Sequence, residues 1–195
     1  MSPVASPDRA SQKRDALLDA ALELFAERGF HGTAVPEVAE RAGVAAGTLY
    51  RYFDSKEALV NALYQREKQA FVESLRRDFP AQAPPREQFS ELWKRLVTFA
   101  LERPQAALFM ELHHHGSYLD ATSRALEEAA FAPVIAFVQR GQEQQALKPV
   151  EPMLLISLVY GAFTGMAKAA LTGQLTLSPE ALAIAEGCLW EAVRL

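Results

Sequence analysis

Apolar residues recur at intervals of three or four along nearly the whole chain, which is the spacing of helices that bury one face. The first stretch shows it clearly, because Leu17, Leu24 and Phe25 lie on one side of a helix while Asp19 and Glu23 lie on the other. No stretch shows a convincing alternation of the kind a half-buried strand needs. The pattern therefore predicts an all-α protein of about nine helices.

Prolines and glycines divide this pattern into segments. Gly29 closes the first helix, and Pro80–Pro85 forms the clearest break in the chain. The expected helices cover residues 11–28, a pair within 35–53, 56–79, 86–101, 104 to the histidines at 113–115, 119–145, 152–172 and 178–195. The helix expected at 56–79 is long enough to connect two halves of a molecule.

Residues 35–53 have the spacing of a helix-turn-helix. Ala39 supplies a small residue where two helices cross, Gly43 a residue that turns left-handed, and Leu49 an apolar residue that packs back on the first helix. Two helices held in this way present the second one to the major groove of DNA. We therefore expect an arm without order at 1–10, a DNA-binding domain at 11–56, a connecting helix at 57–79 and a further helical domain at 80–195.

Composition limits how such a domain attracts DNA. The net charge of the 195 residues is −4, so any affinity must come from a local group of positive charges. Arg41, Arg51 and Lys56 supply one such group, and Arg9 to Arg14 adds a basic stretch ahead of the first helix. A single cysteine, Cys188, is expected to be a small buried residue, and with no signal peptide the chain is predicted to be cytoplasmic.

Residues 43–59, GVAAGTLYRYFDSKEAL, resemble the signature of the TetR family of bacterial transcriptional regulators, and residues 24–33 resemble that family's first helix and turn. The resemblance implies a homodimer on a double-stranded DNA operator, with the two recognition helices in successive major grooves. It implies that Thr33, Tyr50, Arg51 and Lys56 contact phosphates and that the start of the third helix reads bases. The full set predicted to touch DNA is Thr33, Val35, Ala45, Ala46, Gly47, Thr48, Tyr50, Arg51 and Lys56.

The chain departs from the usual family pattern at the start of the third helix. Position 45 is often serine in the family, and Ala45 lacks that capping hydroxyl. Ala46 offers only apolar contact, for example with a thymine methyl group. Base discrimination is therefore expected to fall on Thr48 and the backbone of Gly47, with Arg51 nearby.

The stretch from Met153 to Leu171 is apolar almost all round, which raises the question of a membrane span. We reject a span because the flanks lack anchoring positive charge and an amphipathic helix follows. Small residues at every fourth position instead favour close approach of a second helix, and the last helix adds two leucines. The predicted dimer interface is Ser157, Gly161, Gly165, Ala169, Leu182 and Leu189; the alternative is a core within one chain.

The resemblance also implies a cavity for a small-molecule effector in the C-terminal half. Aromatic residues there suit an apolar ligand, although such residues more often form core. The predicted contacts are Trp93, Phe109, Glu111, His113, His114, Tyr118, Phe131 and Phe163. Three consecutive histidines on a helix cannot bind one ion together, so no metal or other cofactor is expected, and a solvated helix end is the plainest interpretation of His113–His115.

These features favour a ligand-responsive repressor, which a small and largely apolar effector releases from a palindromic operator. One alternative is a constitutive DNA-binding protein with a filled C-terminal core and no effector. A metalloenzyme built on the histidines is the other, but the chain has no HExxH, nucleophile elbow or phosphate-binding glycine loop. We therefore expect a regulator and not an enzyme.

Overall fold

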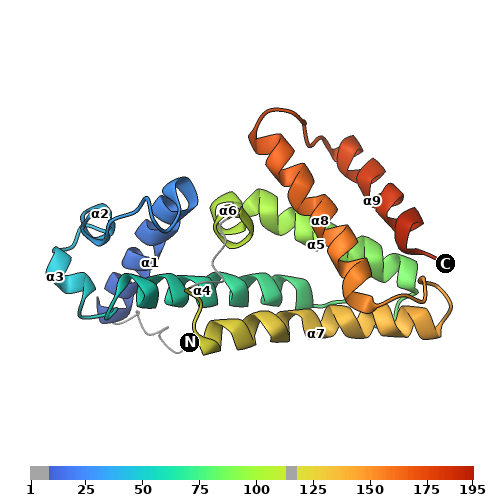
Figure 1. The fold of residues 1–195 in the computed structure, drawn as a ribbon, viewed down its shortest axis with the longest axis horizontal. Coiled ribbons are helices and arrows are strands. Elements are labelled where there is room, and N and C mark those ends of the chain that lie inside the picture. Colours follow the sequence, from blue (N-terminus) through green and yellow to red (C-terminus); the bar gives the residue numbers. More distant parts are fainter. Residues whose placement is uncertain (1–8, 113–117) are drawn as a thin grey trace, which may run out of the picture. The chain divides into compact units, whose positions relative to one another are not determined.

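The computed structural model describes residues 9–112 and 118–195, and within them it contains nine helices and no strand (Figure 1). An isolated bridge pairs Leu147 with Arg194. The helices are α1 Arg9–Arg28, α2 Val35–Arg41, α3 Ala46–Leu49, α4 Lys56–Arg76, α5 Pro85–Glu102, α6 Pro104–Leu112, α7 Ala121–Glu143, α8 Pro152–Leu171 and α9 Pro179–Val193. The all-α prediction is confirmed, and most of the expected arm at 1–10 lies outside the described residues.

The chain forms two compact units. The N-terminal unit is Met1–Gln69 with Arg103–Arg124, and the C-terminal unit is Ala70–Glu102 with Ala125–Leu195. This division differs from the domain boundary expected near residue 80, because α6 joins the N-terminal unit. The physical reason is an aromatic contact: Phe109 of α6 is fully buried and stacks on Phe25 of α1, with ring centroids 6.2 Å apart.

The N-terminal unit has one continuous apolar core. On α1 its buried side chains recur at helical spacing, and Gly29 then ends the helix with a φ of +69°. The core residues are Leu17, Leu18, Ala20, Ala21, Leu24, Phe25, Ala26, Val35, Val38, Ala39, Leu49, Phe53, Leu59, Val60, Leu63, Tyr64, Phe109 and Leu119. Every helix from α1 to α4 contributes, so the helix-turn-helix is fixed on a closed support.

The predicted geometry of the helix-turn-helix is confirmed. Gly43 has a φ of +68°, the left-handed conformation that favours glycine. The N–H of Val44 donates to the carbonyl of Ala39 over 2.9 Å, which closes the turn. Leu49, on α3, is fully buried against this turn's core. Sequence spacing alone therefore located the motif.

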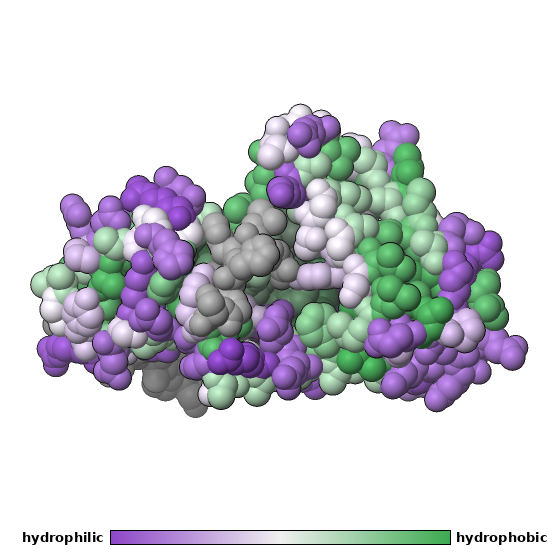
Figure 2. Space-filling model, in the orientation of Figure 1, coloured by the Kyte–Doolittle hydropathy of each residue, from purple (hydrophilic) through white to green (hydrophobic). Residues whose placement is uncertain are grey.

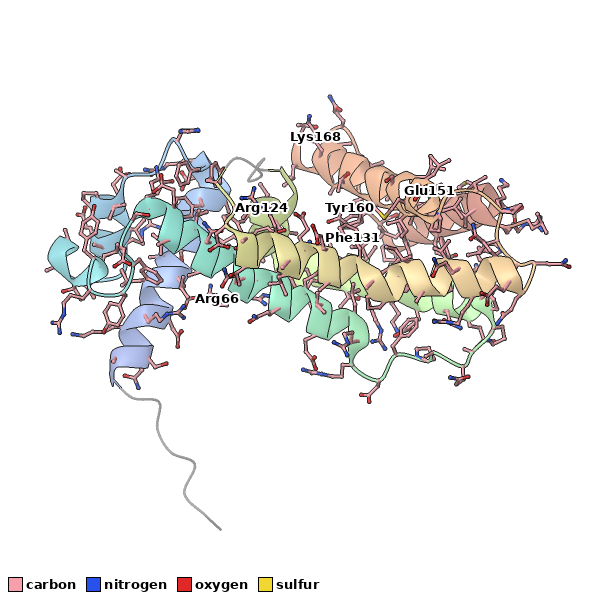
Figure 3. All side chains as sticks on the ribbon, turned by 60° about the horizontal axis from the view of Figure 1, so that its bottom comes forward. Arg66, Arg124, Phe131, Glu151, Tyr160 and Lys168 are labelled. Atoms are coloured by element: carbon pink, nitrogen blue, oxygen red, sulfur yellow. The ribbon has the colours of Figure 1, made fainter. Side chains whose placement is uncertain are left out.

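A buried charge network holds α1, α4 and the residue before α6 together. Glu67 is fully buried and pairs with Arg66 at 2.8 Å and with Arg103 at 2.7 Å. Arg66, labelled in Figure 3, also reaches Asp19 of α1 at 2.7 Å. A buried carboxylate of this kind depends on its partners, because an unpaired charge in a protein interior is strongly destabilising.

The C-terminal unit is built on α5, α7, α8 and α9 and carries two apolar clusters. Phe89, Phe137 and Leu155 belong to the larger one, and Trp93, Val97 and Phe163 form the smaller one. Between α5 and α9, Glu186 accepts hydrogen bonds from Arg86 and from Ser90. The indole N–H of Trp93 donates to the carbonyl of Leu182 over 3.2 Å, so α9 is fixed on α5 by polar as well as apolar contacts.

Within the described residues, α8 is the one helix that is long and apolar enough to cross a membrane. Only 17% of its apolar stretch is buried within the chain. Figure 2 shows the hydrophobic surface that gathers over α8 and α9. An apolar helix left uncovered by its own chain needs another cover.

Candidate nucleic-acid interface

The start of α3 presents small side chains to solvent. Ala45 occupies the cap position with extended backbone, φ −66° and ψ 144°, and provides no side-chain acceptor. The capping bond is therefore absent, as the sequence predicted, and Ala45, Ala46 and Gly47 are all exposed. A flat and uncharged helix start of this kind allows bases or backbone to approach closely.

Gly47 has no structural need to be glycine. A Cβ atom built on it would meet no other atom within 4 Å, and its backbone is not left-handed. Glycine within a helix costs about 1 kcal/mol relative to alanine. The open space beside Gly47 leaves room for an external partner to approach the backbone closely.

Tyr50 and Arg51 follow directly and extend the same surface. Tyr50 is 54% exposed, unusual for a large aromatic side chain, and Arg51 is also exposed. Arg51 makes no ion pair with any carboxylate of the described ranges, whereas Arg41 pairs with Glu23 at 2.6 Å. Arg51 therefore carries a positive charge that no neighbour neutralises, as a phosphate contact requires.

Lys56 lies at the first residue of α4, on the edge of this surface. Its ammonium is 4.3 Å from the centre of the Phe30 ring. Partial burial lowers the pKa of Lys56, and the neighbouring Glu57 acts in the opposite direction. Arg14 of α1 similarly lies over the Phe53 ring, 5.5 Å from its centre. Each of these cations is supported by an aromatic face.

Two of the predicted DNA contacts lie inside the protein instead. Thr33 is 2% exposed, and its hydroxyl faces the carbonyls of Leu24 at 3.1 Å and Gly29 at 3.0 Å. Val35 is also buried, in the core of the N-terminal unit. The expectation that their side chains reach DNA does not fit these positions, because the Thr33 hydroxyl satisfies the end of α1 and Val35 packs α2 onto the core.

The predicted effector contacts do not form one group. Trp93 and Phe163 meet edge to face, with ring centroids 6.2 Å apart, in the smaller cluster of the C-terminal unit. Phe131 is half-buried on the side of α7 that packs toward α8, the helix that carries Tyr160 (Figure 3). Phe109 and Tyr118 belong to the N-terminal unit, where both stack on other aromatic rings. His113, His114 and the side chain of Glu111 lie outside the described residues.

A groove of about 560 Å³ runs between α5 and α9, and sequence reasoning did not predict it. It contains two residues already singled out, Trp93 and Leu182, together with charged side chains. Its lining is Pro80, Glu87, Ser90, Glu91, Trp93, Lys94, Val97, Thr98, Pro179, Leu182, Ala183 and Glu186. Only the contact between α5 and α9 creates it, and no local pattern along either helix signals that contact.

The predicted interface residues divide into two groups. Ser157, Gly161 and Gly165 are exposed on α8, and a Cβ on either glycine would meet nothing within 4 Å. Leu182 and Leu189 of α9 instead pack inward against the cluster around Trp93, as does part of α8 near the half-buried Ala169. On α9 the outward apolar side chains are Ile184, 60% exposed, and Cys188, which the sequence had led us to expect buried.

A search for three or more histidine, cysteine, aspartate or glutamate side chains close enough to hold a metal finds no group among residues 9–112 and 118–195. Asp120 lies just before α7 and has a structural role. Its carboxylate accepts the N–H of Ser123 over 2.7 Å at the start of α7, and chiefly this bond lowers the pKa of Asp120. The carboxylate acts as a helix cap.

Family models of known proteins match residues 17–195 of the chain. Residues 17–63 match the family of bacterial regulatory proteins called tetR, and residues 64–195 match the tetracyclin repressor-like C-terminal domain. The HTH-type transcriptional regulator RutR of Escherichia coli strain K12 is 31% identical over 158 residues, 78% of this chain and 72% of that protein. The fatty acid metabolism regulator protein of Bacillus subtilis is 36% identical over 74 residues, so the chain spans only 38% of that relative's length.

Solved structures agree over nearly the full length. A TetR family transcription regulator from Marinobacter aquaeolei VT8 superposes with a TM-score of 0.85 and 26% identity, covering 97% of this chain and 99% of that one. A putative transcriptional regulator of the same family from Vibrio parahaemolyticus gives 0.76 and 29% identity, with 94% and 99% covered.

Proposed function

The chain belongs to the TetR family of DNA-binding transcriptional regulators, which are not enzymes, and from this we propose that it is a homodimeric repressor that a small, largely apolar effector releases from a palindromic operator. The observation that carries the DNA-binding part is the exposed surface of α3, Ala45 to Arg51, with its unneutralised arginine and a glycine that the fold does not require. A surface of small side chains bordered by cations fits a phosphate-lined groove.

The dimer is supported by the apolar surface of α8 and α9. Leu154 and Leu158 are each about half exposed, and the open glycines Gly161 and Gly165 lie on the same helix. Burying such side chains gains roughly 25 cal/mol for each Å² removed from water. Two copies of this face, related by a two-fold axis, would cover each other and place two α3 helices at half-sites one helical turn apart.

The effector is supported by family membership and by the aromatic residues of the C-terminal unit. Trp93 and Phe163 form a buried apolar cluster, and Trp93 also lines the groove between α5 and α9. Phe131 and Tyr160 are half-buried on α7 and α8. The Bacillus relative is named a fatty acid metabolism regulator, so fatty acids of increasing length are the first compounds to test.

Two measurements test the proposal. Selection of genomic fragments on the full-length protein is expected to enrich sequences with two inverted half-sites, and recovery of single half-sites alone contradicts the dimer. Fatty acids are then titrated while Trp93 emission and the anisotropy of the labelled operator are recorded. We expect ligand to shift the emission and weaken DNA binding, with DNA weakening the ligand by the same factor.

The same titration distinguishes this regulator from a DNA-binding protein that has no effector. A constitutive DNA-binding protein holds its operator equally tightly with every compound that changes the tryptophan signal. A Trp93→Phe variant is the matched control, because Trp190 is then the only tryptophan left. If this variant shows the same change in emission on adding ligand, the ligand binds away from Trp93.

A further inference from the structure

Tyr118 was expected to touch the effector, but its ring lies in the N-terminal unit on the far side of Phe30 from Lys56. The rings of Phe30 and Tyr118 are stacked with centroids 4.2 Å apart and planes 18° from parallel. The Lys56 ammonium is 4.3 Å from the same Phe30 centre. Because the closely stacked Tyr118 ring covers one face of Phe30, the ammonium lies over the other face. Phe25 also stacks on Phe30, at a longer centroid distance of 6.2 Å.

From this arrangement we propose that Phe30 and Tyr118 position the Lys56 ammonium for its contact with DNA. Tyr118 is then a positioning residue for operator binding, although it lies 62 positions beyond Lys56 in the chain. We call Lys56, Phe30 and Tyr118 the Lys56 stack. The inference rests on the proposed contact between Lys56 and a phosphate.

The position of Lys56 argues against a purely structural purpose. A cation at the first residue of a helix faces the positive end of the helix dipole, which is unfavourable for stability. Partial burial adds to this and lowers the pKa of Lys56, while Glu57 offsets it only in part. An aromatic face restrains such a side chain without neutralising it, so the charge remains available to a phosphate.

The backbone around Tyr118 is fixed by α4 itself. Asn61 is 5% exposed, and its amide donates to the carbonyl of Tyr118 over 2.8 Å. The carbonyl oxygen of the same side chain accepts the N–H of Asp120 over 2.8 Å. Since Asn61 lies little more than one helical turn after Lys56, the helix that carries the ammonium also holds the ring that supports Phe30.

The test measures binding to a labelled mixed-sequence duplex of about three helical turns, which reports phosphate contacts without an operator. For Lys56→Ala we expect a loss of about 0.9 in the slope of log K against log salt for each phosphate contact removed. Tyr118→Leu and Phe30→Leu are each expected to weaken binding about two- to fivefold per subunit at low salt, as for loss of an exposed cation–π contact. Tyr118→Phe keeps the stack and is expected to bind as the native protein does.

A double-mutant cycle distinguishes positioning from general loosening. In a Lys56→Ala background, Tyr118→Leu should have no further effect, whereas an equal loss in both backgrounds overturns the inference. Gln65→Ala is the matched control, because it removes a 3.0 Å bond from α4 to Ser123 and changes none of the three side chains of the Lys56 stack. It is expected to leave the salt slope unchanged.

The two proposals fail differently. If Lys56→Ala leaves the salt slope unchanged, the phosphate contact of Lys56 is refuted. If Lys56→Ala lowers the slope while folded Tyr118→Leu and Phe30→Leu bind normally, only the positioning role is refuted. Should those variants not fold, NMR of the native protein decides, because ring currents must move the Lys56 ε-methylene protons upfield, and ordinary shifts overturn the inference.

Discussion

The two units differ in how completely they bury their own apolar residues. Among the described residues, the large hydrophobic side chains left exposed are Tyr50 in the N-terminal unit and, in the C-terminal unit, Leu101, Val150, Leu154, Leu158, Leu171, Leu175, Ile184 and Leu195. The N-terminal unit is therefore closed, and its exposed surface is free to be polar and charged. The C-terminal unit leaves large apolar side chains uncovered, as surfaces that meet a partner do.

This difference in burial suggests different roles for the two units. A closed core holds α3 in place, so the residues proposed to read DNA would be positioned before binding, which limits the entropy lost on association. On the proposed dimer, a second copy would cover the open face of α8 and α9. Specific DNA binding would then need both properties together.

The largest expected effect comes from charging the open face. The double change Leu154→Glu and Leu158→Glu is expected to convert the dimer into monomers, because four carboxylates would be buried in the interface, and to abolish operator binding. Analytical ultracentrifugation measures the mass. Leu101→Glu is the control, since Leu101 is 60% exposed on α5 and should leave the dimer intact. A dimer that survives the double change assigns the interface elsewhere.

The next largest effect is expected from removing the positive charge of Arg51, just after α3. Arg51→Ala should weaken binding to all duplexes at least about tenfold at low salt and lower the salt slope, as expected for a lost phosphate contact. Anisotropy titrations at several salt concentrations measure this. Arg41→Ala should have a much smaller effect, because Glu23 already neutralises that guanidinium. Equal losses for both arginines would mean that the surface extends beyond α3.

A smaller effect is expected at Thr33, where one substitution distinguishes a structural role of the hydroxyl from a contact with phosphate. Thr33→Val keeps the shape of the side chain but removes the hydroxyl, so it should lower the free energy of unfolding by about 1–2 kcal/mol. DNA affinity and the salt slope should not change, because the hydroxyl is occupied by carbonyls of α1 and its following turn. Urea unfolding and anisotropy give the two numbers. Thr33→Ser is the conservative control. A changed salt slope in the valine variant would support the original prediction that Thr33 contacts a phosphate.

The smallest expected effect concerns the cap of α3. Ala45→Ser places a hydroxyl where the backbone already has cap geometry, and this should raise the free energy of unfolding by about 0.5–1 kcal/mol. We expect no other change in the N-terminal unit, and urea unfolding measures the gain in the free energy of unfolding. Ala46→Ser adds a hydroxyl one position later and should not stabilise, so equal gains would argue against capping.

Local patterns were sufficient for much of the N-terminal unit. Ala39, Gly43 and Leu49 act within one turn and two short helices, and the left-handed glycine needs only the local backbone. The same holds for the missing cap at Ala45. The composition of α8 also predicted that this helix has an apolar surface on every side, which needs cover beyond one packed face.

Contacts between distant segments escaped prediction for the opposite reason. Phe109 and Tyr118 carry aromatic side chains that suit a ligand cavity as well as a core, and only the packing of α6 on α1 assigns them to the N-terminal unit. Thr33 likewise has a hydroxyl that either a phosphate or a carbonyl can satisfy.

The sequence by itself determined the helical class, the helix-turn-helix and the family, since each depends on spacing within about 20 residues. Tertiary structure alone decided which apolar stripe of α9 faces outward, where Leu182 and Leu189 turn inward and Ile184 and Cys188 do not. It also decided that Tyr118 reaches Phe30. Helical periodicity gives a residue its side of the helix, but only the neighbouring helices determine which side is buried.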